Sequence, residues 1–160
     1  DYEQPTKYIG RSVDYKHEYD TPVLTAGKTF ILGHTNEKDG IFRDNLPVII
    51  FDDFTTATKF VDFPFKVKSS AMKILHVKRE KADPRYVFYV MQNIEFAFTE
   101  HKRFWISEYS KIKIPLPPLE VQKQVVNELT NEEDLIKKKA GEIAQLKESI
   151  KQRIRQIWSA

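Results

Sequence analysis

The sequence predicts a mixed α/β (α+β) globular domain followed by a single long C-terminal α-helix. Short apolar runs bounded by turn residues fill residues 1–114, and almost all the aromatic residues lie there. Residues 119–158 contain no proline and repeat apolar residues every seven positions. Three prolines within residues 115–118 separate these two patterns. We therefore expect a globular domain at 1–114, a proline hinge at 115–118 and a long helix at 119–158.

Three apolar runs in the first part have the length and composition of β-strands. They are Phe30–Leu32, Val48–Phe51 and Met72–Val77, which are rich in β-branched and aromatic residues. Turn signals at Lys38–Gly40 and Asp44–Pro47 lie between them. These runs predict that a β-sheet forms the centre of the domain.

One segment of the first part, residues 83–98, has the pattern of an α-helix. Asp83 is suited to the N-cap, and Pro84 occupies the first helical position. Spacings of four, three and four place the following apolar residues on one face: Val87, Met91, Ile94 and Phe98. We expect this face to pack against the sheet.

The C-terminal helix carries an apolar stripe with heptad spacing. Its residues are Leu129, Ile136, Ile143, Ile150 and Ile157, broadened by Leu146 and Ile154. Forty residues make a helix about 60 Å long, whereas a domain of this size is only about 30 Å across. The stripe therefore predicts pairing with a second helix, although packing against the chain's own domain remains an alternative.

The overall composition excludes several classes of protein. The chain has 26 Lys and Arg against 23 Asp and Glu, so a nucleic-acid site must be a local basic patch. Cysteine is absent, which excludes disulfide scaffolds, thiolate metal sites and cysteine nucleophiles. No apolar run approaches the roughly 18 residues that suggest a membrane span, so we expect no membrane partner.

The motifs associated with catalysis are incomplete, and we expect neither a catalytic nor a metal site. Residues 22–29 resemble the end of a phosphate-binding loop, but Pro22 stands where glycine is required and a strand follows. Asp52 and Asp53 follow a strand, as magnesium ligands do in nucleases. A cap for the turn at Thr55–Thr56 is the interpretation we favour for one of these carboxylates.

Basic and hydroxyl-bearing stretches are the remaining functional signal. They are Thr55–Lys59, the run from Lys66 to Lys81, and residues 101–105 with Lys102 and Arg103. Lysine and arginine bind phosphates, serine and threonine add hydrogen bonds, and arginine can bind a guanine edge. From these residues alone, a DNA-binding surface and an ordinary solvated surface both remain open.

Three stretches together resemble the specificity subunit of type I restriction–modification systems. Residues 112–126 around the prolines resemble the junction between a target recognition domain and a conserved helix. Residues 21–35 resemble the opening strands of such a domain, and residues 48–59 with 69–73 resemble its middle. The resemblance spans nearly the whole chain.

The resemblance implies a DNA-binding module with no catalytic role. In this family two recognition domains sit at opposite ends of two antiparallel helices, and each domain recognises half of a bipartite double-stranded DNA site. Methyltransferase (modification) and restriction/translocase subunits assemble around them in the cytoplasm. S-adenosylmethionine, ATP and magnesium then belong to the partner subunits, and this chain needs no cofactor. One recognition domain and one helix imply either a piece of a longer subunit or a half-subunit that forms a homodimer.

On this basis we predict which residues face DNA, chosen for their hydroxyl or basic side chains in the stretches above. They are Thr55, Thr56, Thr58, Lys59, Ser69, Ser70, Lys73, Lys102 and Arg103, with Lys28 as a weaker candidate. Arg103 is the one residue assigned to a base edge. Two other functions remain as alternatives. The first is an enzyme, either a magnesium-dependent nuclease using Asp52 and Asp53 or the recognition end of a fused restriction–methyltransferase. The second is a coiled-coil assembly protein without DNA binding.

Overall fold

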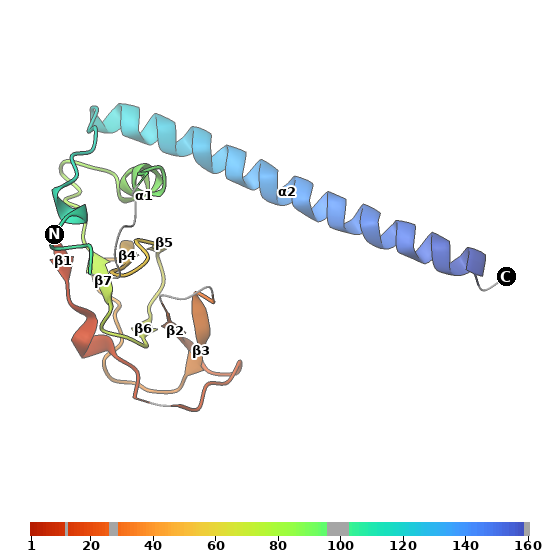
Figure 1. The fold of residues 1–160 in the computed structure, drawn as a ribbon, viewed down its shortest axis with the longest axis horizontal. Coiled ribbons are helices and arrows are strands. Elements are labelled where there is room, and N and C mark those ends of the chain that lie inside the picture. Colours follow the sequence, from red (N-terminus) through yellow and green to blue (C-terminus); the bar gives the residue numbers. More distant parts are fainter. Residues whose placement is uncertain (12, 26–28, 96–102, 159–160) are drawn as a thin grey trace. The chain divides into compact units, whose positions relative to one another are not determined.

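The computed structural model describes residues 1–11, 13–25, 29–95 and 103–158. It divides into two compact units, Asp1–Leu119 and Glu120–Ala160. A sheet-rich globular domain is followed by one long C-terminal helix, as the sequence predicts. In chain order the elements are β1 (Tyr2–Glu3), η1 (Pro5–Tyr8), β2 (Thr21–Leu24), β3 (Ile31–Thr35), β4 (Val48–Asp52), β5 (Thr58–Val61), β6 (Lys66–Val67), β7 (Met72–Leu75), α1 (Pro84–Gln92), η2 (Tyr109–Lys111) and α2 (Leu119–Trp158) (Figure 1).

Two small sheets form the first unit. A four-stranded antiparallel sheet has the order β1-β7-β4-β5, and a three-stranded sheet has the order β3-β2-β6. In the second sheet β2 pairs with β3 in the antiparallel direction and with β6 in the parallel direction. Because the ladders are mostly antiparallel and α1 packs on β4 and β5, the domain is of the α+β type.

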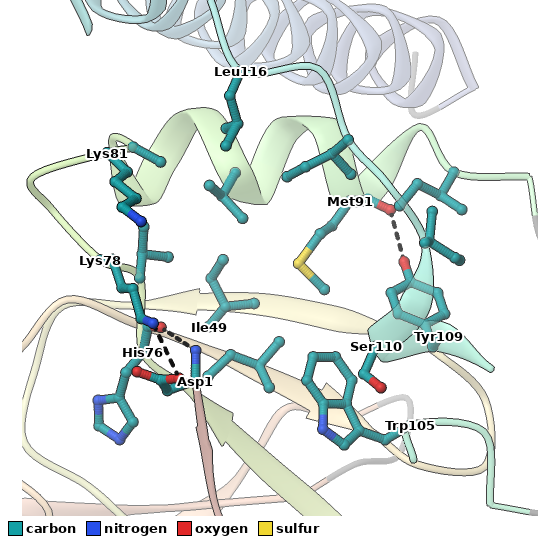
Figure 2. Close-up of a pocket in the computed structure, with 17 residues that line it drawn as sticks. Asp1, Ile49, His76, Lys78, Lys81, Met91, Trp105, Tyr109, Ser110 and Leu116 are labelled. Carbon is teal, nitrogen blue, oxygen red and sulfur yellow. Dashed lines mark hydrogen bonds and ion pairs between the residues drawn. The ribbon is translucent and has the colours of Figure 1, made fainter. Parts of the chain in front are cut away.

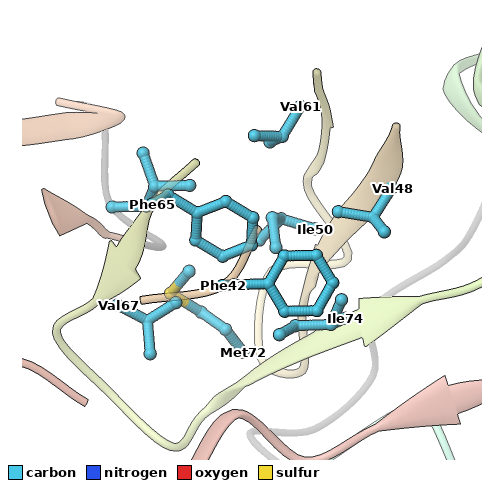
Figure 3. Packing of buried hydrophobic residues seen from close by; sticks show 9 residues of the cluster. Phe42, Val48, Ile50, Val61, Phe65, Val67, Met72 and Ile74 are labelled. Atoms are coloured by element: carbon cyan, nitrogen blue, oxygen red, sulfur yellow. The ribbon is translucent and has the colours of Figure 1, made fainter. Parts of the chain in front are cut away.

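The strand β4 divides the apolar core into two layers. Its side chains alternate, so that Val48 and Ile50 face one cluster, and Ile49 and Phe51 face the other. The first cluster fills the space between the two sheets (Figure 3). The second lies between the four-stranded sheet, α1 and the segment around Tyr109. Every residue of β4 is buried, which explains its nearly continuous apolar sequence.

Helix α1 starts where the sequence predicts and ends earlier. The Asp83 carboxylate accepts hydrogen bonds from the backbone N–H groups of Arg85 and Tyr86 at 2.8 and 3.0 Å. The helix ends at Gln92 rather than at residue 98, because Asn93 turns back: its side-chain amide donates to the Tyr89 carbonyl at 2.9 Å.

The predicted apolar face of α1 is confirmed where the structure describes it. Met91 is buried, and Val87 and Ile94 pack against the same cluster, which also contains Ile49 of β4. Phe98, the last residue predicted on this face, lies outside the described residues.

Helix α2 carries the predicted stripe along its whole length. Leu129 is half-buried, and the other stripe residues are exposed in the single chain: Ile136, Ile143, Leu146, Ile150, Ile154 and Ile157. Neither α1 nor α2, the α-helices of the described residues, is both long and apolar enough to cross a membrane.

Candidate nucleic-acid interface

The strand directions bring several loops to one end of the first unit, which we call the loop end. Strand β4 ends there and β5 and β7 begin there, because Phe51 is paired with both Thr58 and Lys73. Strands β2 and β6 end side by side, since the N–H of Lys68 donates to the Leu24 carbonyl at 2.9 Å. The loop that follows β6 lies beside the end of β4, because the Asp53 N–H donates to the Ala71 carbonyl at 3.1 Å. The loop end therefore contains the β4–β5 turn, residues 53–57, and the β6–β7 loop, residues 68–71.

Asp52 organises the β4–β5 turn. Its carboxylate accepts hydrogen bonds from the N–H groups of Phe54 at 2.8 Å and Thr55 at 3.4 Å. Its carbonyl accepts a further bond from the N–H of Thr56, whose φ of 56° closes the turn. The prediction that one of the paired carboxylates caps this turn is confirmed, and the cap fixes how the turn presents its side chains.

Asp53 joins a distant segment to the same turn. Its carboxylate accepts a hydrogen bond from the Trp105 N–H at 2.8 Å, and its carbonyl accepts one from the Phe104 N–H at 3.0 Å. The carboxylate also forms an ion pair with Lys73 at 2.7 Å. Asp53 thereby places residues 103–107 beside the turn and makes them part of the loop end.

Two predicted DNA contacts are corrected by burial. The Lys73 side chain is fully buried, and its ammonium group pairs with the buried Asp53 carboxylate. Thr58 is only 7% exposed, since it lies inside the β4–β5 ladder opposite Phe51. Neither side chain can reach a duplex at the surface. Lys66, within the basic run, is buried as well and pairs with Glu37 at 3.0 Å.

The other predicted residues that the structure describes gather at the loop end. Thr55 and Ser70 are exposed, and Thr56 and Ser69 are partly exposed. The Ser69 hydroxyl accepts a hydrogen bond from the Ala71 N–H at 3.1 Å, which shapes the β6–β7 loop beside the turn. Lys28 and Lys102 lie outside the described residues.

The positive charges at the loop end lie against aromatic rings. The Lys59 ammonium lies 5.8 Å from the centre of the Phe30 ring. The Lys68 ammonium donates to the Tyr15 hydroxyl at 2.9 Å, and the Arg103 guanidinium lies 5.8 Å from the Phe54 ring centre. All three cations are exposed. The loop end therefore offers cations, hydroxyl groups and an exposed ring, which suits contact with phosphates and base edges.

Phe54, which is 45% exposed at the tip of the β4–β5 turn, is a residue of the loop end that is absent from the residues predicted to face DNA. An available signal was its position directly after the Asp52–Asp53 pair, since a turn residue that follows a cap is held at the surface. Lys68 was counted within the basic run but was not singled out.

An apolar pocket of about 330 Å³ lies elsewhere in the first unit, between α1, the four-stranded sheet and the chain from Trp105 to Leu116 (Figure 2). The Tyr109 hydroxyl donates to the Met91 carbonyl across it at 3.3 Å, and burial raises the pKa of Tyr109. The Tyr86 hydroxyl donates to the Pro115 carbonyl at 3.2 Å. These contacts anchor the chain that leads to α2, and the apolar lining is unsuited to a phosphodiester.

The described residues show no constellation for metal chemistry. Within residues 1–11, 13–25, 29–95 and 103–158, no three His, Asp or Glu side chains are grouped so as to hold a metal ion. Asp52 and Asp53, the carboxylates considered as magnesium ligands, are instead engaged in the turn and in the pair with Lys73.

Comparisons with known proteins agree on one family. The sequence model of the family described as "Type I restriction modification DNA specificity domain" matches residues 5–148. The "Type I restriction enzyme EcoR124I/EcoR124II specificity subunit" of Escherichia coli is 58% identical over 120 residues, which cover 72% of this chain. The matched part is 30% of the length of that relative.

Proposed function

This chain belongs to the type I restriction–modification DNA specificity domain family, and from that premise we propose that its first unit binds duplex DNA sequence-specifically through the loop end. The observation that carries the proposal is the convergence on that end of the hydroxyl and basic residues predicted to face DNA. Thr55, Ser70 and Arg103 come from three separate loops, yet backbone hydrogen bonds to Asp53 hold all three loops together.

The residues at the loop end take different roles in this proposal. Lys59 and Lys68 bind phosphates, because a flexible ammonium group is a point charge without directional preference for a base. Arg103 binds a base edge, since its planar guanidinium can donate two parallel hydrogen bonds to guanine in the major groove. Thr55, Thr56 and the β6–β7 serines donate to nearby phosphates or bases.

We also propose that the chain works as one half of a larger DNA-recognising assembly. The matched relative is named as a specificity subunit, and this chain corresponds to 30% of its length. In that assembly the first unit recognises half of a bipartite site in the cytoplasm. Methyltransferase and restriction/translocase subunits supply catalysis with S-adenosylmethionine, ATP and magnesium, so this chain has no catalytic role and needs no cofactor.

The long helix would serve as the spacer of this assembly. Its apolar stripe extends over four heptads and, apart from the half-buried Leu129, is exposed in the single chain, so a second helix would bury it. The partner helix belongs to a second copy of the chain or to a second recognition domain. Antiparallel pairing would set the distance between the two DNA half-sites.

The test is a selection of random-sequence duplexes by the purified chain at low salt. We expect a short motif to be enriched, and Arg103→Ala to relax preference at one position by about 1–3 kcal/mol. Uniform loss on all duplexes would make Arg103 a phosphate contact. Failure of the chain to retain any duplex would contradict the proposal and favour a pure assembly protein.

Two lysines offer a matched comparison in the same assay. Lys59 lies at the loop end, whereas Lys78 follows β7 at the opposite end of the sheet, and both side chains are exposed. We expect Lys59→Ala to weaken binding to all duplexes and to reduce the salt slope by about one, while Lys78→Ala leaves both unchanged. The reverse result would move the interface to the opposite end.

A further inference from the structure

Phe54 is held in an exposed position by contacts that do not involve its ring. Its N–H donates to the Asp52 carboxylate at 2.8 Å, so the backbone of the turn is fixed. The ring nevertheless remains 45% exposed at the tip of the turn. A large apolar side chain that a fixed turn exposes to water is preorganised to contact an apolar group on a partner.

Arg103 covers part of this ring. Its guanidinium carbon lies 5.8 Å from the ring centre, within the range of a cation–π contact. The position of Arg103 is set by its neighbours, since the Phe104 and Trp105 N–H groups both donate to Asp53. The Ser107 hydroxyl also donates to the Arg103 carbonyl at 3.0 Å. The backbone is therefore fixed independently at Phe54 and at Arg103, and the two side chains lie next to each other.

The major groove of DNA offers one apolar group, the 5-methyl of thymine. Intercalation between base pairs would need both faces of the ring, so the Arg103 guanidinium, 5.8 Å from the ring centre, would have to move aside. We propose that Phe54 is a specificity-determining residue that contacts a thymine methyl group in the major groove. This inference rests on the proposed function and extends it to a residue and a chemical group.

The geometry also relates the two recognised bases. Stacked bases are about 3.4 Å apart along each strand, so a separation of 5.8 Å between guanidinium and ring corresponds to one or two steps. The thymine should therefore lie within two base pairs of the position at which Arg103→Ala relaxes preference.

The test replaces each thymine of the selected duplex, one at a time, with deoxyuridine, which lacks only the 5-methyl group. We expect one replacement to weaken binding of the unaltered chain about fourfold, the effect of removing one buried methyl-sized group. With Phe54→Ala the same replacement should have no effect. Lys78→Ala is the control, because Lys78 is exposed, follows β7 at the opposite end of the sheet and should leave the uridine effect intact.

Each result decides a different point. If the chain selects a motif but tolerates every deoxyuridine, the methyl contact is wrong while the proposed function stands. If Phe54→Ala weakens binding equally on thymine and uridine duplexes, the ring acts as a wedge or a general contact, which also overturns the inference. If no motif is selected, the proposed function fails first. The uridine series on the unaltered chain needs no variant, so a folding defect cannot obscure the result.

Discussion

Asp53 connects three parts of the first unit through one carboxylate and its own backbone. Its carboxylate pairs with Lys73 and accepts a hydrogen bond from Trp105, and its N–H donates to Ala71. The side chains of Asp53 and Lys73 are 2% and 0% exposed. A buried pair of this kind is costly to break, because removal of one partner leaves the other charge buried without compensation.

We therefore expect Lys73→Met to lower the free energy of unfolding by about 3–5 kcal/mol. The measurement is urea denaturation of the variant beside Lys59→Met, which changes an exposed lysine on β5 of the same sheet and should alter stability little. The double variant Asp53→Asn with Lys73→Met should recover part of the loss, because no uncompensated charge remains. A loss below about 1 kcal/mol, the range of surface ion pairs, would contradict burial of the pair.

Glu3 makes the stability of the folded chain depend on pH. Burial alone would raise the pKa of its carboxyl, but hydrogen bonds from Lys7, His76 and Tyr8 outweigh burial and lower the pKa below its ordinary 4.5. The unfolded chain then binds the proton more tightly than the folded chain does. The stabilisation is present above pH 4.5 and is lost as the pH falls through the folded-state pKa.

Glu3→Gln should therefore lower the free energy of unfolding at neutral pH. In acid, the free energies of unfolding of the variant and of the unaltered chain should lie closer together. Urea denaturation at neutral pH and at about pH 3 measures both differences. A constant difference across the whole pH range would show that the Glu3 charge contributes nothing and that only packing was lost.

For single residues, the sequence predicted contacts between near neighbours along the chain but not contacts between residues far apart in the sequence. A cap by Asp52 or Asp53 was predicted because the two carboxylates directly precede the turn, and the structure confirms it for Asp52. Lys73 was predicted to face DNA because it lies in a basic stretch of a sequence that resembles a DNA specificity subunit. Its partner is twenty positions away, and only the folded structure shows that the two apolar clusters cover both faces of β7.

Helix α1 depends on its N-cap. Asp83 accepts two backbone hydrogen bonds, and Pro84 supplies the fixed backbone angle of the first helical position. Asp83→Ala should lower the free energy of unfolding by about 0.5–2 kcal/mol, whereas Asp83→Asn or Ser should retain most of the stability. Thermal denaturation of the three variants checks this, and equal losses for all three would show that the carboxylate charge, not the cap, is what stabilises the helix.

The elements differed in how far the sequence could predict them. Strands β4 and β7 have long apolar runs and were recognised, whereas β5 mixes Thr58 and Lys59 with apolar residues and β6 has only two residues. Such short strands are defined by their neighbours in the ladder rather than by their own composition. Helix α1 ends at Gln92, where the Asn93 side chain binds the Tyr89 carbonyl. The sequence predicted a longer helix because its apolar spacing continues beyond this point.

The stripe on α2 makes a prediction about the whole molecule. Ile143 and Ile150 are 52% and 57% exposed in the single chain, and we expect them to be buried against a second helix. Ile143→Asp should shift a dimer of this chain towards monomer, since a charge in an apolar seam is strongly disfavoured. Gln145→Asp is the control, because it adds the same charge about 200° around the helix.

Sedimentation equilibrium of the three proteins provides the measurement. The unaltered chain and Gln145→Asp should show the mass of a dimer at concentrations where Ile143→Asp is monomeric. A monomer for the unaltered chain at every concentration would contradict pairing between copies. Equal dimerisation of all three proteins would place the contact away from the stripe.

The central claim is that the loop end of the first unit faces DNA. Amide hydrogen exchange, measured with and without the selected duplex, tests it most directly. The account predicts slower exchange at residues 53–57, 68–71 and 103–107 in the complex, with no change at residues 44–47 and 76–81 at the opposite end of the sheet. Protection of the opposite end, with the three loops unchanged, would contradict it.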